Sequence, residues 1–69
     1  LIVITGTIAN LDTSAELGDF LSEILFAQAI PNHAVGAPQA TGIDTTSTTK
    51  VVFSDPGANG GRLIVFGKR

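Results

Sequence analysis

The sequence predicts a small α+β domain with the element order β-α-β-β. Three observations lead to this fold class. Residues 1–4 and 63–66 are short apolar runs typical of buried strands, residues 13–29 repeat their apolar positions with a helical period, and residues 54–61 are dense in turn formers. The predicted architecture is a three-stranded sheet with one amphipathic helix on one face and the other face buried in an assembly. Residues 1–69 form a single small domain.

The first predicted strand covers residues 1–8 and is apolar on both faces. Leu1 and Val3 point to one side, and Ile2 and Ile4 point to the other. A strand with one face in water alternates apolar and polar residues, whereas a strand buried on both faces does not. A single helix covers only one face of a sheet, so a neighbouring subunit is expected on the second face.

The predicted helix begins at a capping box, Thr13-Ser14-Ala15-Glu16. It ends near Ala29, because Ile30 precedes Pro31 and a residue before proline is disfavoured in the α region. A core face would contain Leu17, Phe20, Leu21, Ile24 and Leu25.

Phe26 projects from the opposite side of this predicted helix, among polar residues. One exposed Phe needs no explanation alone. In a chain that is short of charge, it indicates a second buried contact.

Residues 31–44 contain two Pro and two Gly without a clear period, and they are interpreted either as an extended arm across a neighbouring subunit or as a mobile loop. A Thr-rich stretch then leads into a second strand over residues 45–53. Residues 62–67 form the third strand, so the turn at 54–61 would close a β-hairpin.

Composition points to assembly. The 69 residues are 43% hydrophobic and only 14% charged, against about 25% charged in a typical soluble domain. A chain of this size buries only about 60% of its unfolded surface and usually needs a disulfide, a metal or a partner. Cys is absent and His33 is the single His, which leaves partner subunits as the expected source of stability.

Charge is distributed unevenly along the chain. Residues 1–49 carry five acidic residues and no Lys or Arg, whereas residues 50–69 carry four basic residues and one acidic residue. These opposite charges suit contact between the halves, within one chain or between neighbours. The pI near 4.9 and the scattered basic residues argue against nucleic-acid binding. The apolar runs are too short to cross a bilayer, which takes about 20 residues, so no membrane role is expected.

Candidate cofactor chemistry is weak. Residues 1–7 resemble the first strand of a dinucleotide-binding unit, but no further glycines follow Gly6 at the required spacing, and Asp12 places negative charge where a phosphate would lie. The acidic residues Glu16, Asp19 and Glu23 are interpreted as a solvated or salt-bridged strip, because nothing predicts a cleft around them.

Two further features carry little chemistry. His33 lies in a loop without a nucleophile motif. The Gly-rich segment 57–61 followed by Arg62 is a candidate anion contact through Gly60, Gly61 and Arg62, but a plain hairpin turn is the preferred interpretation. Arg62 is then expected to pair with the acidic strip.

The expected function is structural, without enzymatic activity, cofactor or metal. The chain is expected to be a subunit of a homo-oligomer or larger particle, with copies of itself or a protein shell as partners. A small capsid-decorating or accessory protein of a virus is one such case. The alternatives are a small ligand-binding or regulatory domain that uses the Gly-rich turn and Arg62, and an enzyme fragment. The expected interface residues are Leu1, Ile2, Val3, Ile4, Phe26, Leu63, Ile64, Val65 and Phe66.

Overall fold

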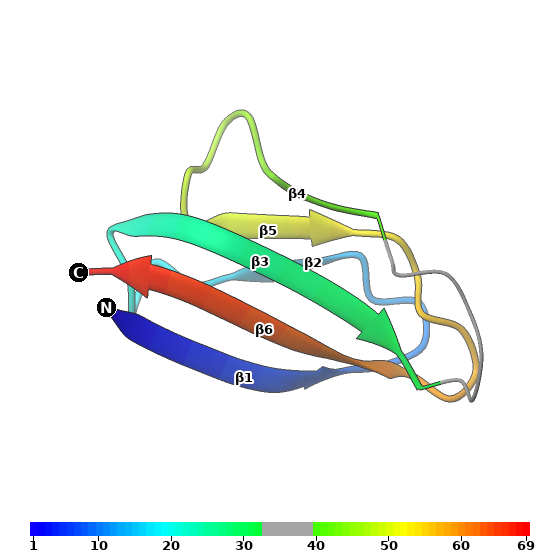
Figure 1. Cartoon of the computed structure of the whole chain (residues 1–69). Helices are drawn as coiled ribbons and strands as arrows, with labels where there is room; N and C mark the ends of the chain where they lie inside the picture. The colour runs from blue at the N-terminus through cyan, green and yellow to red at the C-terminus, as the bar shows by residue number, and fades with distance from the viewer. Residues whose placement is uncertain (33–39) are drawn as a thin grey trace.

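The computed structural model describes residues 1–32 and 40–69, which form an all-β domain of two layers (Figure 1). The described residues contain six strands and no helix. The strands are β1 (Ile2–Ile8), β2 (Ser14–Glu16), β3 (Glu23–Pro31), β4 (Thr41–Ile43), β5 (Lys50–Phe53) and β6 (Gly61–Lys68). The first sheet has the order β1-β6-β3 and the second sheet has the order β2-β5-β4, with every pair antiparallel. The predicted α+β class is therefore wrong.

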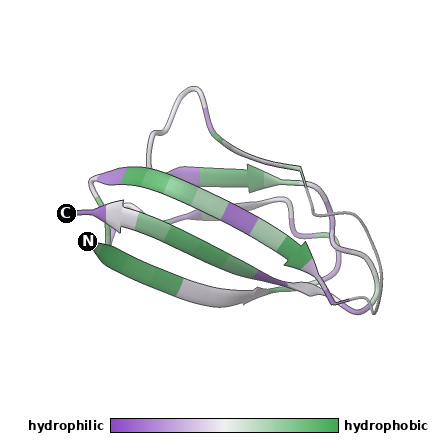
Figure 2. Cartoon of the chain, viewed as in Figure 1, coloured by the Kyte–Doolittle hydropathy of each residue, from purple (hydrophilic) through white to green (hydrophobic). Residues whose placement is uncertain are grey.

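The core lies between the two sheets and is built from alternating residues of both. Figure 2 shows that apolar residues predominate along β3, β5 and β6 and in the first half of β1. Val51 of β5 and Val65 of β6 are fully buried in one cluster. The second sheet therefore covers the inner face of the first sheet, as the helix was expected to do. The buried cluster consists of Ile8, Leu17, Leu21, Ile24, Ala29, Val51, Phe53, Leu63 and Val65.

The central strand β6 is paired on both sides, with β1 and with β3. Its inward positions are all buried and combine large and small residues. At Gly67, an added Cβ would lie 2.5 Å from the carbonyl oxygen of Glu23 and 2.7 Å from a methyl group of Leu21. At Gly61 it would lie 2.5 Å from the carbonyl oxygen of Ile30. Glycine is needed at both positions because the chain of β3 passes too close for a side chain.

The helix predicted from the capping box over residues 13–29 is replaced by β2, a turn and β3. The expected cap residues pair across the second sheet instead. The carbonyl oxygen of Thr13 accepts a hydrogen bond from the Phe53 N–H, and the Glu16 carboxylate accepts from residues 47 and 49. These long-range bonds satisfy groups that a helix would have satisfied locally.

A β-bulge explains why β3 has a helical pattern in the sequence. The register with β6 shifts between Ile24 and Phe26, so that Leu25 is the extra residue. Buried or half-buried inward positions consequently fall at Ile24 and Ala27, three residues apart. Together with the buried Leu17 and Leu21 in the preceding turn, this spacing reproduces the 3–4 residue period of an amphipathic helix.

The other connections also differ from the prediction. β5 and β6 do not form a hairpin, because they belong to different sheets. Of the stretch 45–53, only Lys50–Phe53 is a strand, and Asp44 caps the turn before it by accepting hydrogen bonds from Thr46. Within the expected arm 31–44, residues Thr41–Ile43 form β4. Pro31 is the last residue of β3, and the part of the expected arm over residues 33–39, with His33, lies outside the described residues.

Two turns meet at one end of the sandwich and are joined by Asp55. Its carboxylate accepts hydrogen bonds from the N–H of Leu11 at 2.8 Å and of Gly57 at 2.9 Å. Leu11 has φ of 76°, which is rare for a residue with a side chain, and Gly60 has φ of 65° in the facing turn. The carboxylate thus holds the β1–β2 connection against the β5–β6 connection.

Replacement of Gly67 by Ala is expected to destabilise the fold by about 1–3 kcal/mol, because the new methyl group would overlap backbone and Leu21. Gly42→Ala is the matched control, since an added Cβ there has no atom within 4 Å. Its effect is expected to stay within about 0.5 kcal/mol. Chemical denaturation followed by circular dichroism measures both, and equal effects would contradict the placement of β6.

Candidate functional site

The outer face of the first sheet is the candidate functional site. The pairing register arranges its outward side chains in rows that cross all three strands. One row, next to the Glu23–Lys68 pair at the end where the termini lie, is entirely apolar and is termed the apolar row; it consists of Val3, Phe66 and Phe26. The next row is Thr5, Ile64 and Gln28, and the last is Thr7, Arg62 and Ile30.

The apolar row is open to solvent. Val3 is 51% exposed and Phe26 is 52% exposed, while Phe66 between them is half-buried. The rings of Phe26 and Phe66 contact each other with centroids 5.8 Å apart and planes tilted by 39°. Aromatic pairs of this geometry are favourable, and they leave their outer surfaces free to contact another molecule.

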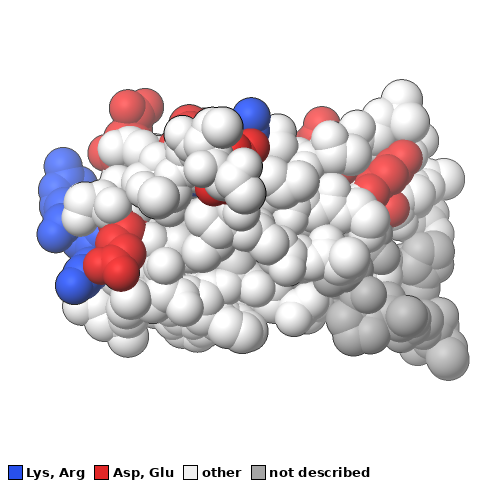
Figure 3. Space-filling model, turned by 90° about the horizontal axis from the view of Figure 1, so that it is seen from above, with Lys and Arg blue, Asp and Glu red and all other residues white. Residues whose placement is uncertain are grey.

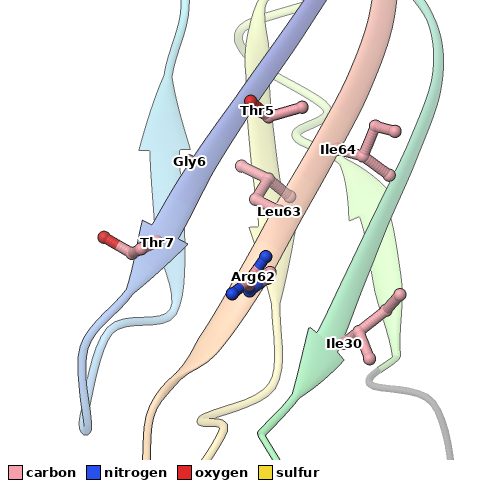
Figure 4. Close-up of a pocket in the computed structure, with 7 residues that line it drawn as sticks. All are labelled: Thr5, Gly6, Thr7, Ile30, Arg62, Leu63 and Ile64. Atoms are coloured by element: carbon pink, nitrogen blue, oxygen red, sulfur yellow. The ribbon is translucent and has the colours of Figure 1, made fainter.

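A shallow groove of about 550 Å³ lies over the other two rows (Figure 4). Figure 4 shows Arg62 on the middle strand, between Thr7 of β1 and Ile30 of β3. Arg62 is exposed and forms no ion pair with the described residues, contrary to the expected pairing with the acidic strip. The groove is lined by Thr5, Gly6, Thr7, Ile30, Arg62, Leu63 and Ile64.

The charged groups concentrate elsewhere. Figure 3 shows Lys and Arg side chains gathered at the end of the molecule where both termini lie, beside acidic side chains. There the Lys68 ammonium group lies 3.1 Å from the Glu23 carboxylate, and the Arg69 guanidinium donates to the carbonyl oxygen of Phe20. The oppositely charged halves of the sequence therefore meet within one chain. Both partners of the ion pair are more than half exposed, so the pair contributes little stability.

Glu16 has a structural environment. Its carboxylate accepts hydrogen bonds from the hydroxyls of Thr49 at 2.7 Å and Ser47 at 2.9 Å, and from the Gly18 N–H at 3.0 Å. These hydrogen bonds hold the pKa of Glu16 below its ordinary value of 4.5, and the bond from the Thr49 hydroxyl has the largest effect. The carboxylate ties the 44–49 loop to β2.

Two aspartates act in the same way within their own turns. The hydroxyl and N–H of Thr46 lower the pKa of Asp44 below its ordinary value. The N–H groups of Gly57 and Leu11 lower the pKa of Asp55. The described residues contain no group of three or more His, Asp or Glu that could hold a metal ion.

The residues predicted as an interface divide between the surface and the core. Leu1, Val3 and Phe26 are exposed, and Ile64 and Phe66 are half-buried on the outer face. Ile2 and Ile4 are half-buried against the core, whereas Leu63 and Val65 are inside it. The structure thus brings five of the predicted residues onto one surface or its border and removes the others from it.

The candidate anion contact does not form one cradle. Gly60 and Gly61 are buried against the backbone of Ile8 and Ile30, whereas Arg62 points out of the sheet. The turn also has its own carboxylate, Asp55.

The sequence reasoning missed several residues of the outer face. Ile30 comes directly after the predicted helix, and Gln28 falls within it. Thr5 and Thr7 fall in the first predicted strand, but no contact or binding role is predicted for them. Their alternation with Ile4, Gly6 and Ile8 was the available signal for one solvent-facing side.

The domain is a sandwich of two antiparallel sheets with an apolar row on the outer face of the first sheet. Nothing matches the chain among protein-family models, curated proteins or solved structures. In the part of the chain that the structure describes, no helix has the length and apolar character needed to cross a membrane.

Glu16→Gln is expected to lower stability at neutral pH, because the carboxylate loses charge-assisted hydrogen bonds. The folded-state pKa is lowered, so the stabilisation is present above about 4.5 and is lost as the pH falls through the folded pKa. The difference between Glu16→Gln and the original chain should therefore shrink at about pH 3. Urea unfolding at both pH values measures it.

Asp19→Asn is the control, because this exposed carboxylate has no hydrogen-bond partner among the described residues. It should unfold as the original chain does at neutral pH. A Glu16→Gln effect that is the same at both pH values would contradict the role of the charge.

Proposed function

We propose that the chain is a structural subunit that assembles with copies of itself into a homo-oligomer or a larger particle. The single observation that carries this proposal is the apolar row on the outer face of the first sheet. Its side chains are not needed to close the core, which the second sheet already covers. Contiguous apolar surface of this kind usually marks a contact between proteins.

The energetics favour this use of the face. Complete burial of one Phe or Val side chain contributes about 1.5–3 kcal/mol, and half of the Val3 and Phe26 side chains is still available. A standard interface takes about 800 Å² from each partner, just under a fifth of the 4336 Å² surface of this chain. Few charged residues have to be desolvated, because only 14% of the residues are charged.

Composition supports the kind of assembly that we propose. A chain of 69 residues without Cys and with low charge suits a small repeated component. A decorating or accessory subunit of a viral particle is the form that we propose, with the particle as its location.

The native mass tests the proposal. Light scattering after size-exclusion chromatography at micromolar concentration is expected to give at least twice the 7.1 kDa of one chain. Phe26→Ser should shift the species toward the monomer, because it removes half of the exposed aromatic pair while leaving the core residues in place. Its circular dichroism spectrum should remain that of a β-protein.

Phe20→Ser is the matched control. Phe20 is 56% exposed, similar to Phe26, but it lies in the turn before β3 and outside the apolar row. Its substitution should leave the mass unchanged. A monomeric original chain, or equal loss of mass in both variants, would contradict the proposal.

The second candidate is a ligand-binding role at Arg62, and the groove is the observation that favours it. The guanidinium is free to form a bidentate pair with a carboxylate or phosphate, and the hydroxyls of Thr5 and Thr7 lie on the neighbouring strand. The buried Gly60 and Gly61 would support the strand without contacting the ligand.

Titration with inorganic phosphate tests this role. The amide signals of Arg62 and Thr7 should shift in a saturable way, and Arg62→Ala should abolish the shifts. Lys68→Ala is the control for nonspecific attraction and should leave them in place. Absence of saturable shifts at Arg62 would contradict a ligand site for this anion.

A further inference from the structure

The two side openings of the sandwich differ in how they are closed. On one side β3 lies against β4, and the Ala29 N–H donates to the Thr41 hydroxyl oxygen at 3.1 Å. On the other side, β1 pairs only with β6 among the described residues. Figure 1 shows β1 along the free border of the first sheet. The backbone N–H and C=O groups of β1 that face away from β6 have no partner strand in the part of the chain that the structure describes.

Free edges are usually protected by charge, proline, a bulge or a very short strand. β1 has none of these features. Its residues are Ile2-Val3-Ile4-Thr5-Gly6-Thr7-Ile8, without a charge or a proline, and six of the seven are β-branched. The register with β6 is regular from Ile2 to Ile8. An edge of this kind accepts another strand readily.

We propose that β1 pairs antiparallel with β1 of a second copy of this chain, about a two-fold axis at Thr5. This inference rests on the proposed assembly function and specifies its contact. Antiparallel pairing about Thr5 would place Val3 opposite Thr7 of the second copy, both on the outer face. On the inner face, Ile2 would lie opposite Ile8, and Ile4 opposite Gly6.

Pairing of β1 with itself about Thr5 is sterically complementary on the inner face, because Ile2 would face Ile8 and the large Ile4 would face the small Gly6. This complementarity favours a second copy of the chain as the occupant. The inward residues of β1 meet inward residues, so both cores stay on the same side of the combined sheet. An added Cβ at Gly6 has no atom within 4 Å, so the space beside Gly6 is open to the large Ile4 side chain of the second copy. No charged residues oppose each other along the contact.

The pairing would produce a continuous six-stranded sheet, with β3-β6-β1 of each copy on either side of the axis. The apolar row of each copy would then lie on the same outer face. Pairing of the β1 edges would therefore form the dimer. The two apolar rows on the outer face of the dimer would then offer a wider apolar surface for contact with further copies.

Cysteine cross-linking tests the pairing, and the chain provides a clean background because it contains no Cys. Directly opposite residues of antiparallel strands have Cα atoms about 4.5–5.5 Å apart, within the span of a disulfide. Thr5→Cys is therefore expected to give a covalent dimer under mild oxidation, because residue 5 meets itself on the axis. Thr5 is exposed and outward, so the substitution should not disturb the core.

Thr7→Cys is the matched control, since it is another exposed outward Thr of the same strand. Two copies of residue 7 would be about 13 Å apart in this register, too far for a disulfide. The double variant Val3→Cys/Thr7→Cys should restore the covalent dimer, because residues 3 and 7 are opposite each other.

The outcomes separate this inference from the proposed function. Cross-linking of Thr5→Cys and of the double variant, without cross-linking of Thr7→Cys alone, would support the pairing. A native mass of two or more chains without a Thr5→Cys dimer would overturn the β1 contact and leave the assembly proposal in place. A native monomer that forms no cross-link would overturn both, and cross-linking of Thr7→Cys alone would overturn the axis at Thr5.

Discussion

The structure depends on β6, which is hydrogen-bonded on both sides and has every inward position buried. Leu63 and Val65 contribute to the core, while Gly61 and Gly67 let the backbone of β3 pass at a distance that no side chain allows. A shift of register would bring Leu63 or Val65 to places where only glycine fits. The alternation of large and small residues in β6 therefore fixes the register of both neighbouring strands. That register in turn decides which residues point outward, and hence the composition of the outer face.

The outer face follows from a shortage of polar residues. Four of the six acidic side chains satisfy backbone or hydroxyl groups of connections, namely Asp12, Glu16, Asp44 and Asp55, and Glu23 pairs with Lys68. Little charge is left for the outer face of the first sheet. Its three rows between β1, β6 and β3 contain one charged residue, Arg62, and the Glu23–Lys68 pair lies beyond the apolar row. Turn formation and surface solubility draw on the same small set of charges, so the outer face of the first sheet carries little charge and includes the apolar row. This distribution of charge is one of the observations that support the proposed assembly.

Part of the candidate site was accessible from the sequence. Leu1, Val3 and Phe26 were predicted as contact residues and are exposed, since low charge and unbalanced apolar positions are visible without a structure. Leu63 and Val65 were predicted with them but lie in the core. An apolar run does not reveal which alternate residues face inward; the partner strands decide that. Arg62 was named for its glycine neighbours, yet its surroundings are the side chains of β1 and β3.

The sequence by itself determined the strands at residues 1–8 and 62–67, the turn at 54–61 and the excess of apolar surface, because each depends on local residue type and composition. Only the tertiary structure decided the state of residues 13–29. A bulge at Leu25 gives β3 an inward spacing of three residues, which is also the spacing of a helix, and a local pattern cannot distinguish the two. The choice is made by pairing with β6 and β5, whose residues lie more than 30 positions further along the chain.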